Sequence, residues 1–195
     1  AVVSGFQVQF GQKEITTPGD QADVLVAMNP AALMANMKWL KYGATIIIDI
    51  DNFDNKHYKK AEYEEDPLHD DSLTGYNLVK APISVLSRNV ATQHGLDNKT
   101  ADKTKNQFVA GLLYWLFNRD IKIGEEFLKE KFKSKPDLVK ANIAVLQEGY
   151  NYAETIEALS TTYHVSPVKG KEGLFRNISG NQATAWGLLA AAERA

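Results

Sequence analysis

Apolar and polar residues follow two different patterns along the first half of the chain. Residues 6–10 alternate between the two classes, which predicts a strand with one buried face. Residues 23–28 and 45–50 are apolar at almost every position, as is typical of parallel strands that helices cover on both faces. We expect a further strand at 76–81, and a short return strand at 14–16.

A helix should connect the first two apolar strands. Asn29 can accept hydrogen bonds from the first helical turn, and Pro30 suits the first helical position because that position needs no N–H donor. Apolar residues at helical spacing continue through Leu40, so we place the end of this helix near Gly43. Two buried strands joined by a short helix predict a parallel βαβ unit.

Helical periodicity dominates the second half of the chain. We expect helices at 55–65, 82–95, 106–118, 127–132 and 137–156, with a polar loop at 66–75. This arrangement predicts the α/β class and a three-layer α/β/α domain with a largely parallel sheet. Residues 166–177 mix Pro and Gly with charged residues and are interpreted as a linker.

The last residues predict a helix that is apolar on nearly every side. Asn181, or alternatively Ser179, is a suitable N-cap for a helix over 182–195. A helix of this composition is typical of the interior of a larger body. Within this chain we expect it to fold back onto the domain or to pack against a second copy, because an isolated short helix is only marginally stable in water.

Both ends of the sequence indicate a piece of a longer polypeptide. The chain begins in a strand-like segment, and its last helix has no terminating Gly, Asn or Pro after it. We therefore expect an N-terminally truncated domain at 1–165, the linker at 166–177 and a third segment, itself truncated, at 178–195.

Composition excludes several classes of function. The chain has 195 residues, 22 of them basic and 24 acidic, and its formal net charge of -2 gives no overall field that would attract nucleic acid or an anionic membrane. No stretch has the length and apolar character of a membrane span. Cysteine is absent, so the chain cannot supply thiolates to an iron–sulfur cluster or to a cysteine-rich zinc site.

The carboxyl ends of the apolar strands carry the polar residues best placed to meet a ligand. Open α/β sheets bind ligands at this edge, where a helix N-terminus favours a phosphate or a carboxylate. Asn29 after the first apolar strand and Asp51 after the second are therefore positional candidates for a cofactor-binding site. The alternative for Asn29 is that it only caps its helix, and no Gly-x-Gly-x-x-Gly motif follows any strand.

No group of residues predicts a metal site or a catalytic centre. The acidic run at 49–54 resembles the start of a calcium loop, but Phe53 stands at a ligand position and the required Gly and distal Glu are absent. The four histidines are scattered, and no serine lies in a Gly-x-Ser-x-Gly elbow. The lysines at 129–135 are interpreted as a solvated helix face; the alternative is a docking patch for an acidic partner or a phosphorylated cofactor.

Taken in order, several segments resemble the gamma domain of 2-oxoacid:ferredoxin oxidoreductases. These segments are Ser4–Gly11, Thr17–Asp20 and Asp23–Asn29. Others resemble the 2-oxoglutarate type, in which gamma domain and alpha subunit form one chain, namely Asp97–Lys99, Trp115–Asp120, Lys135–Asn142 and Gly149–Tyr152. The tail at 178–187 resembles the start of the alpha part. The resemblance covers essentially the whole chain and rests on the order and spacing of many segments.

The resemblance implies a non-catalytic domain of an enzyme that oxidatively decarboxylates 2-oxoglutarate with coenzyme A and ferredoxin in the cytoplasm. It implies that this chain binds no cofactor alone, and that thiamine diphosphate, Mg and iron–sulfur clusters lie elsewhere in the complex. The implied partners are the rest of its own alpha chain, the thiamine-diphosphate-binding beta subunit and, through the complex, ferredoxin. Residues 178–195 would then begin the domain that binds the pyrimidine side of thiamine diphosphate.

Two features of the family are missing from this sequence. The Gly-rich turn after the family's first strand is absent, and so is the Tyr-Pro-x-Thr-Pro segment of the thiamine site. The alternative function is a freestanding anion- or nucleotide-binding α/β module that uses the helix N-terminus at Asn29. A third class is an independent enzyme.

Overall fold

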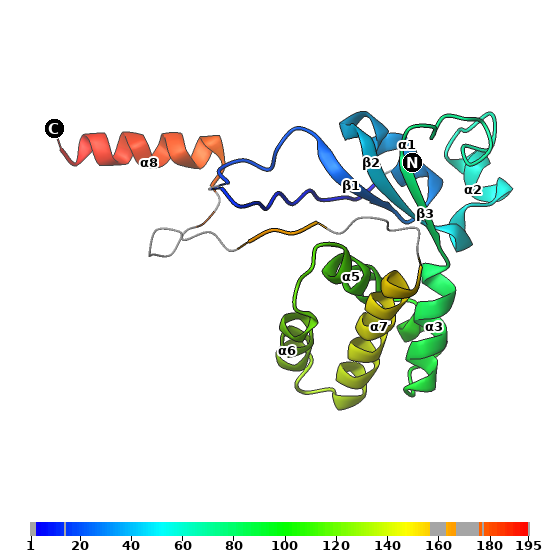
Figure 1. The fold of residues 1–195 in the computed structure, drawn as a ribbon. Coiled ribbons are helices and arrows are strands. Elements are labelled where there is room, and N and C mark those ends of the chain that lie inside the picture. Colours follow the sequence, from blue (N-terminus) through cyan, green and yellow to red (C-terminus); the bar gives the residue numbers. More distant parts are fainter. Residues whose placement is uncertain (1–2, 14, 157–162, 167–175, 177, 195) are drawn as a thin grey trace.

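A computed structural model describes residues 3–13, 15–156, 163–166, 176 and 178–194. At its centre, β1 (Ala22–Ala27), β2 (Leu40–Asp49) and β3 (Asn77–Ala81) form a three-stranded sheet in the order β1-β2-β3. Both neighbouring pairs are parallel. The predicted α/β class and parallel sheet are therefore confirmed, and the sheet lies against a group of helices (Figure 1).

One face of the sheet packs against two short helices. Ile46 and Ile48 of β2 are fully buried on this side, together with Leu33 of α1 (Pro30–Asn36). Tyr58 of α2 (Asn55–Lys60) lies in the same apolar cluster. The alternation of a strand places every second side chain here, and the intervening residues go to the opposite face.

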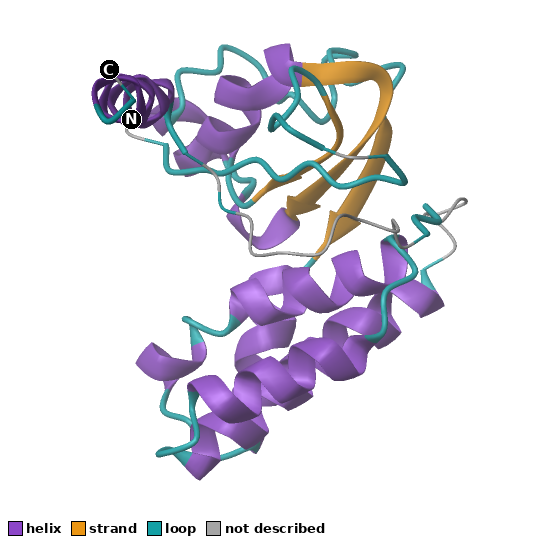
Figure 2. Ribbon diagram, turned by 90° about the vertical axis from the view of Figure 1, so that its left-hand side faces the viewer, coloured by secondary structure: helices purple, strands orange, loops and turns teal. Residues whose placement is uncertain are grey.

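The opposite face packs against the larger helical layer. Ile47 of β2 and Val79 of β3 lie in a second cluster with residues of three long helices, α3 (Ile83–Gln93), α5 (Lys105–Leu116) and α7 (Pro136–Thr155). Figure 2 shows this layer below the strands. Since both faces are covered, the sheet has the three-layer α/β/α arrangement that its uninterrupted apolar strands predict.

Two glycines allow the central helices of this layer to touch. A side chain on Gly111 of α5 would overlap the backbone carbonyl of Leu146, and a side chain on Gly149 of α7 would overlap that of Phe108. The backbones of α5 and α7 are therefore in direct contact. The helix α6 (Ile121–Lys131) packs on the outside of this pair.

The boundary between α1 and β2 differs from the prediction. The helix ends at Asn36, a 3-10 turn η1 (Met37–Trp39) follows, and Leu40 already belongs to β2. Gly43 has φ +78° next to a register shift between β1 and β2, so it permits a bulge within the strand instead of ending a helix. Apolar spacing alone could not separate these two possibilities.

The predicted strand at 6–10 is wrong. These residues belong to no strand of the sheet, and the side chain of Phe6 is 94% exposed. Gln7 donates hydrogen bonds to the carbonyls of Pro18 and Gly19, so this segment is held by side chains and not by a neighbouring strand. The return strand at 14–16 is also not formed at 15–16, and Glu14 lies outside the described residues.

Other features also differ from the prediction, including α6, which begins at Ile121 and not at 127. The helix α2 ends at Lys60 rather than at 65, because Glu62 adopts φ 65° and breaks the helical path. Ile50 leaves β2 for a 3-10 turn, η2 (Ile50–Asn52). A short helix, α4 (Asn98–Ala101), was not predicted, although Asp97 caps it in the ordinary way.

The final helix, α8 (Gly180–Ala192), stands away from the rest of the molecule (Figure 1). Ser179 caps it and forms a capping box with Gln182, so the second of the two predicted N-caps is used. Trp186, Leu188 and Leu189 are 52%, 69% and 60% exposed. The predicted fold-back onto the domain is not seen, and packing against a second copy stays a prediction. Most of the predicted linker at 166–177 lies outside the described residues.

None of the described helices combines the length and the hydropathy needed to cross a membrane.

Candidate functional site

Polar side chains meet where β2 and β3 end. Asp49 is the last residue of β2 and is fully buried. Its carboxylate accepts hydrogen bonds from the Ser84 backbone N–H at 3.1 Å, from the Ser84 hydroxyl at 2.5 Å and from the Asn52 side-chain amide at 2.7 Å. A buried carboxylate is tolerated only with such partners. Asp49 therefore joins β2, η2 and the start of α3.

Asp51 makes the second contact between these elements. Its carboxylate accepts a hydrogen bond from the Val85 backbone N–H at 2.7 Å. Burial raises the pKa of Asp51, and the neighbouring Asp49 raises it further, although the Val85 hydrogen bond acts in the opposite direction. Two of the orphan N–H groups in the first turn of α3, those of Ser84 and Val85, are thus satisfied by carboxylates of the chain itself.

A cavity of about 320 Å³ opens beside this contact. It is lined by Asp51, Asn52, Ser84, Val85, Arg88, Asp102 and Lys105. Its charged side chains are two acidic and two basic, and the Arg88 guanidinium is 2.6 Å from the Asp102 carboxylate. The cavity can therefore offer hydrogen-bond donors and acceptors to a polar ligand, with Lys105 available for one anionic group.

The structure brings only one of the two predicted site residues to this cavity. Asp51 lines it, and Asn29 is not among the lining residues. The Asn29 side chain instead accepts a hydrogen bond from Ala32 N–H at 2.9 Å, which is the capping role that was its alternative interpretation. With α1 only seven residues long and Pro30 lacking an N–H, little of an anion site is left at this helix end.

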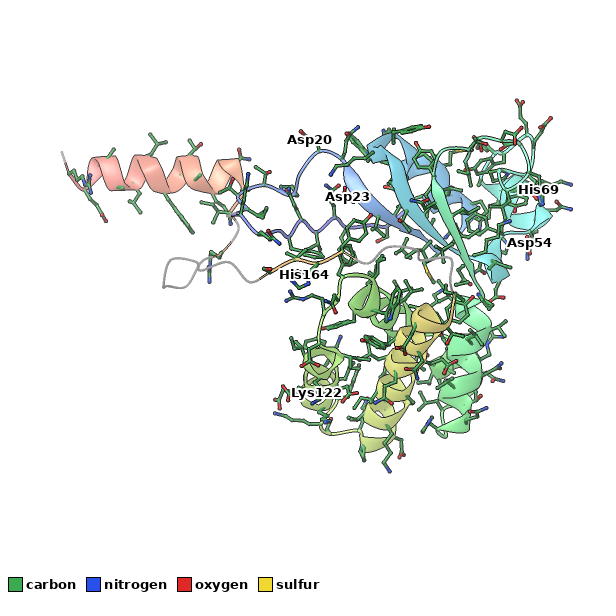
Figure 3. All side chains as sticks on the ribbon, viewed as in Figure 1. Asp20, Asp23, Asp54, His69, Lys122 and His164 are labelled. Carbon is green, nitrogen blue, oxygen red and sulfur yellow. The ribbon has the colours of Figure 1, made fainter. Side chains whose placement is uncertain are left out.

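The acidic run at 49–54 does not converge on one point. Asp54 caps α2 by accepting from His57 N–H, and the two hydrogen bonds from His57 lower its pKa. Figure 3 places Asp54 at α2. In the part of the chain that the structure describes, no three His, Cys, Asp or Glu residues lie close enough together to hold a metal ion.

Sequence reasoning missed most of the residues that line the cavity. Ser84 could have been found, because it follows the third predicted strand and parallel strands end at one edge of a sheet. Arg88 follows Ser84 by one turn of α3 and could have been found with it. Asp102, which follows α4, and Lys105 of α5 reach this edge only through tertiary packing, and no local pattern in the sequence marks them.

Comparison with known proteins identifies the family of the chain. The family described as pyruvate ferredoxin/flavodoxin oxidoreductase matches residues 2–152. The chain belongs to the pyruvate ferredoxin/flavodoxin oxidoreductase family. The resemblance seen in the sequence is thereby confirmed, and all the residues that line the cavity fall within the matched part.

A curated relative in the family is the 2-oxoglutarate oxidoreductase subunit KorA of Mycobacterium tuberculosis. The two sequences are 39% identical over 193 residues, which are 99% of this chain and 30% of that subunit. The chain therefore spans about a third of the length of this relative.

A solved structure shares the fold. It is a 2-oxoglutarate:ferredoxin oxidoreductase from Magnetococcus marinus with 2-oxoglutarate, coenzyme A and succinyl-CoA bound. The match has a TM-score of 0.58 at 21% sequence identity, and it covers 80% of this chain and 24% of that chain. At this identity the likeness supports the α/β fold and no further property.

Proposed function

We propose that this chain is a non-catalytic domain of a cytoplasmic 2-oxoglutarate:ferredoxin oxidoreductase, which supports assembly of the enzyme and access of coenzyme A. The observation that carries the proposal is the 39% identity to a 2-oxoglutarate oxidoreductase subunit over 99% of this chain. Identity at this level over the whole chain supports a shared role, whereas the fold alone would not.

The residues present do not fit the redox and thiamine cofactors of such an enzyme. The chain has no cysteine for an iron–sulfur cluster. Its described residues hold no cluster of acidic side chains for the magnesium ion of thiamine diphosphate, and Asp49 and Asp51 already bind the start of α3. These cofactors are therefore proposed to lie on other parts of the enzyme, with which this chain assembles and through which ferredoxin is reduced.

The cavity beside Asp51 is the proposed contact with coenzyme A. Lys105 would bind a phosphate group, and Asp51 and Asn52 would hydrogen-bond to hydroxyl or amide groups. These residues bind and orient the co-substrate and do not take part in its reaction. Residues 178–195, whose described helix exposes its apolar side chains, are proposed to begin the thiamine-diphosphate domain.

Calorimetric titration of the chain with coenzyme A, ADP and NAD tests this proposal against a freestanding nucleotide-binding module. We expect weak binding of coenzyme A and no saturable binding of NAD, because the cavity provides only one side of the co-substrate site. Tight, saturable binding of ADP or NAD by the chain alone would contradict the proposed function and support the module.

A further inference from the structure

The two cationic side chains of the cavity beside Asp51 differ in their partners. Arg88 donates one hydrogen bond, from Nε to the Asp102 carboxylate at 2.6 Å. Among the described residues, its terminal amino groups have no acceptor, and Lys105 has no ion pair. A guanidinium carries five N–H donors. Four of the donors of Arg88 and the whole ammonium group of Lys105 are therefore available to a ligand.

The ion pair between Arg88 and Asp102 is easily opened. The two side chains are 46% and 50% exposed, and an exposed pair of this kind contributes little to stability because water competes for both charges. The contact also uses a single N–H group. A phosphate group can instead accept two parallel hydrogen bonds from a guanidinium, which makes it the better partner for Arg88.

The balance of charges in the cavity makes such an exchange selective. Two carboxylates and two cations line it, so the empty cavity has no net attraction for anions in general. An anion that leaves Arg88 with Asp102 gains only the contact with Lys105. An anion that takes Arg88 from Asp102 gains both cations. This favours a compact group with several acceptor oxygens and a charge close to −2, which describes a phosphate monoester.

The size of the cavity indicates which part of coenzyme A it holds. A volume of about 320 Å³ is at the lower end of the range for small-ligand sites, so only one part of the co-substrate fits. The nucleotide end of coenzyme A carries a phosphate monoester at the ribose 3′ position, beside the 2′-hydroxyl. This hydroxyl can donate to the Asp51 carboxylate. The diphosphate of coenzyme A has its charges on two phosphorus atoms and no hydroxyl beside it.

We propose that Arg88 determines the specificity of this contact by exchanging the Asp102 carboxylate for the 3′-phosphate of coenzyme A, which it binds together with Lys105. Asp102 is then a positioning residue that holds Arg88 at the empty cavity and is displaced by the ligand. No covalent bond of coenzyme A changes at this site. The inference rests on the proposed coenzyme A contact and identifies the group that the contact selects.

Competitive inhibition of the assembled enzyme, measured against coenzyme A, tests the exchange. The two inhibitors are adenosine 3′,5′-bisphosphate and AMP, which differ only in the 3′-phosphate. They are compared in the wild type and in the variants Arg88→Ala and Asp102→Asn. The matched control is Arg119→Ala, which removes an exposed arginine outside the cavity.

In the wild type, we expect the inhibition constant of the bisphosphate to be at least roughly tenfold lower than that of AMP. Arg88→Ala should raise the bisphosphate constant roughly tenfold and leave the AMP constant unchanged. Asp102→Asn should lower the bisphosphate constant by a factor of about two to five, because the competing carboxylate is removed. Arg119→Ala should change neither constant, and kcat should be the same in all four proteins.

Three results would overturn the inference: equal inhibition constants of the two compounds in the wild type, a bisphosphate constant that Arg88→Ala leaves unchanged, or an equal rise of both constants in that variant. Lys105→Ala separates these results from a failure of the proposed function. If it still raised KM for coenzyme A, the coenzyme A contact would be supported without the exchange at Arg88. If it did not, the contact itself would be contradicted.

Discussion

A single carboxylate, that of Asp49, connects the carboxyl edge of the sheet to the helical layer. It is fully buried and accepts three hydrogen bonds from Ser84 and Asn52. Removal of Asp49 would leave the Ser84 and Asn52 donors without their acceptor in partly buried positions, where water can only partly replace it. Stability at this edge should therefore depend strongly on Asp49.

Asp49→Ala should lower the free energy of unfolding by about 2 kcal/mol, because three donors in partly buried positions lose their acceptor. Urea denaturation followed by circular dichroism measures this loss. The control is Asp23→Ala, which removes an exposed ion pair with Lys41 and should cost less than about 1 kcal/mol. If both variants lost the same free energy of unfolding, the Asp49 hydrogen bonds would stabilise the fold no more than an exposed ion pair does.

The raised pKa of Asp51 gives stability a defined pH dependence. Folding raises this pKa above its ordinary value of 3.8, so ionisation of Asp51 opposes folding. The penalty is absent below the ordinary pKa and develops as the pH rises through the raised pKa. Asp51→Asn keeps an acceptor for the Val85 N–H and removes this penalty.

We therefore expect Asp51→Asn to be more stable than the wild type at about pH 7, by less than about 1 kcal/mol because the side chain is partly exposed. The difference should disappear at about pH 3, where Asp51 is protonated in both states. Urea denaturation at both pH values measures it. A variant that is less stable at neutral pH would mean that the ionised carboxylate is needed for the Val85 contact.

At the scale of elements, the crossing of α5 and α7 depends on glycine. The Cβ of an alanine at position 149 would overlap the carbonyl of Phe108, which belongs to a helix backbone and cannot rotate away. Gly149→Ala should therefore cost about 2 to 3 kcal/mol through separation of the helices, even though alanine favours helix by about 1 kcal/mol. Thermal unfolding measures the change.

Gly187→Ala in α8 is the matched control, because a Cβ there would meet nothing within 4 Å. It should leave the melting temperature unchanged or slightly raised. A Gly149→Ala variant as stable as this control would contradict the close contact between α5 and α7.

Elements for which the apolar spacing and the residues at both ends indicate the same structure were predicted correctly from the sequence. The β2 core at 45–49, α3 with Pro82 before it and Gly95 after it, and α7 all appear near their predicted positions. The end of α1 was wrong because Leu40 fits both helical spacing and a buried strand, and only the tertiary structure decides between them. The segment 6–10 has the pattern of a strand but no neighbouring strand in the sheet. Alternation of apolar and polar residues predicts that a strand has one buried face, but it does not show that a neighbouring strand is present to pair with it.

The candidate site was predictable only in part, for a related reason. Asp51 was found because strand ends mark a ligand-binding edge. The cavity also needs Lys105 from α5, whose approach depends on the packing of the helical layer. Asn29 satisfied the same positional rule, but its side chain caps α1 and does not line the cavity.

At the scale of the whole molecule, the chain combines a packed α/β domain with a large exposed apolar surface. Phe6 and Val8 are 94% and 65% exposed, and α8 buries none of its side chains. Exposed apolar surfaces of this kind usually mark contacts with other protein. They agree with the proposed role in assembly with other protein.

Steady-state kinetics of the assembled enzyme with Lys105→Ala in this chain is the most direct measurement. Loss of one cation from the proposed coenzyme A contact should raise KM for coenzyme A roughly fivefold to tenfold and leave KM for 2-oxoglutarate unchanged. Lys99→Ala, an exposed lysine outside the cavity, should change neither constant. An unchanged KM for coenzyme A with Lys105→Ala, or an equal rise in both constants, would contradict a coenzyme A contact at this cavity.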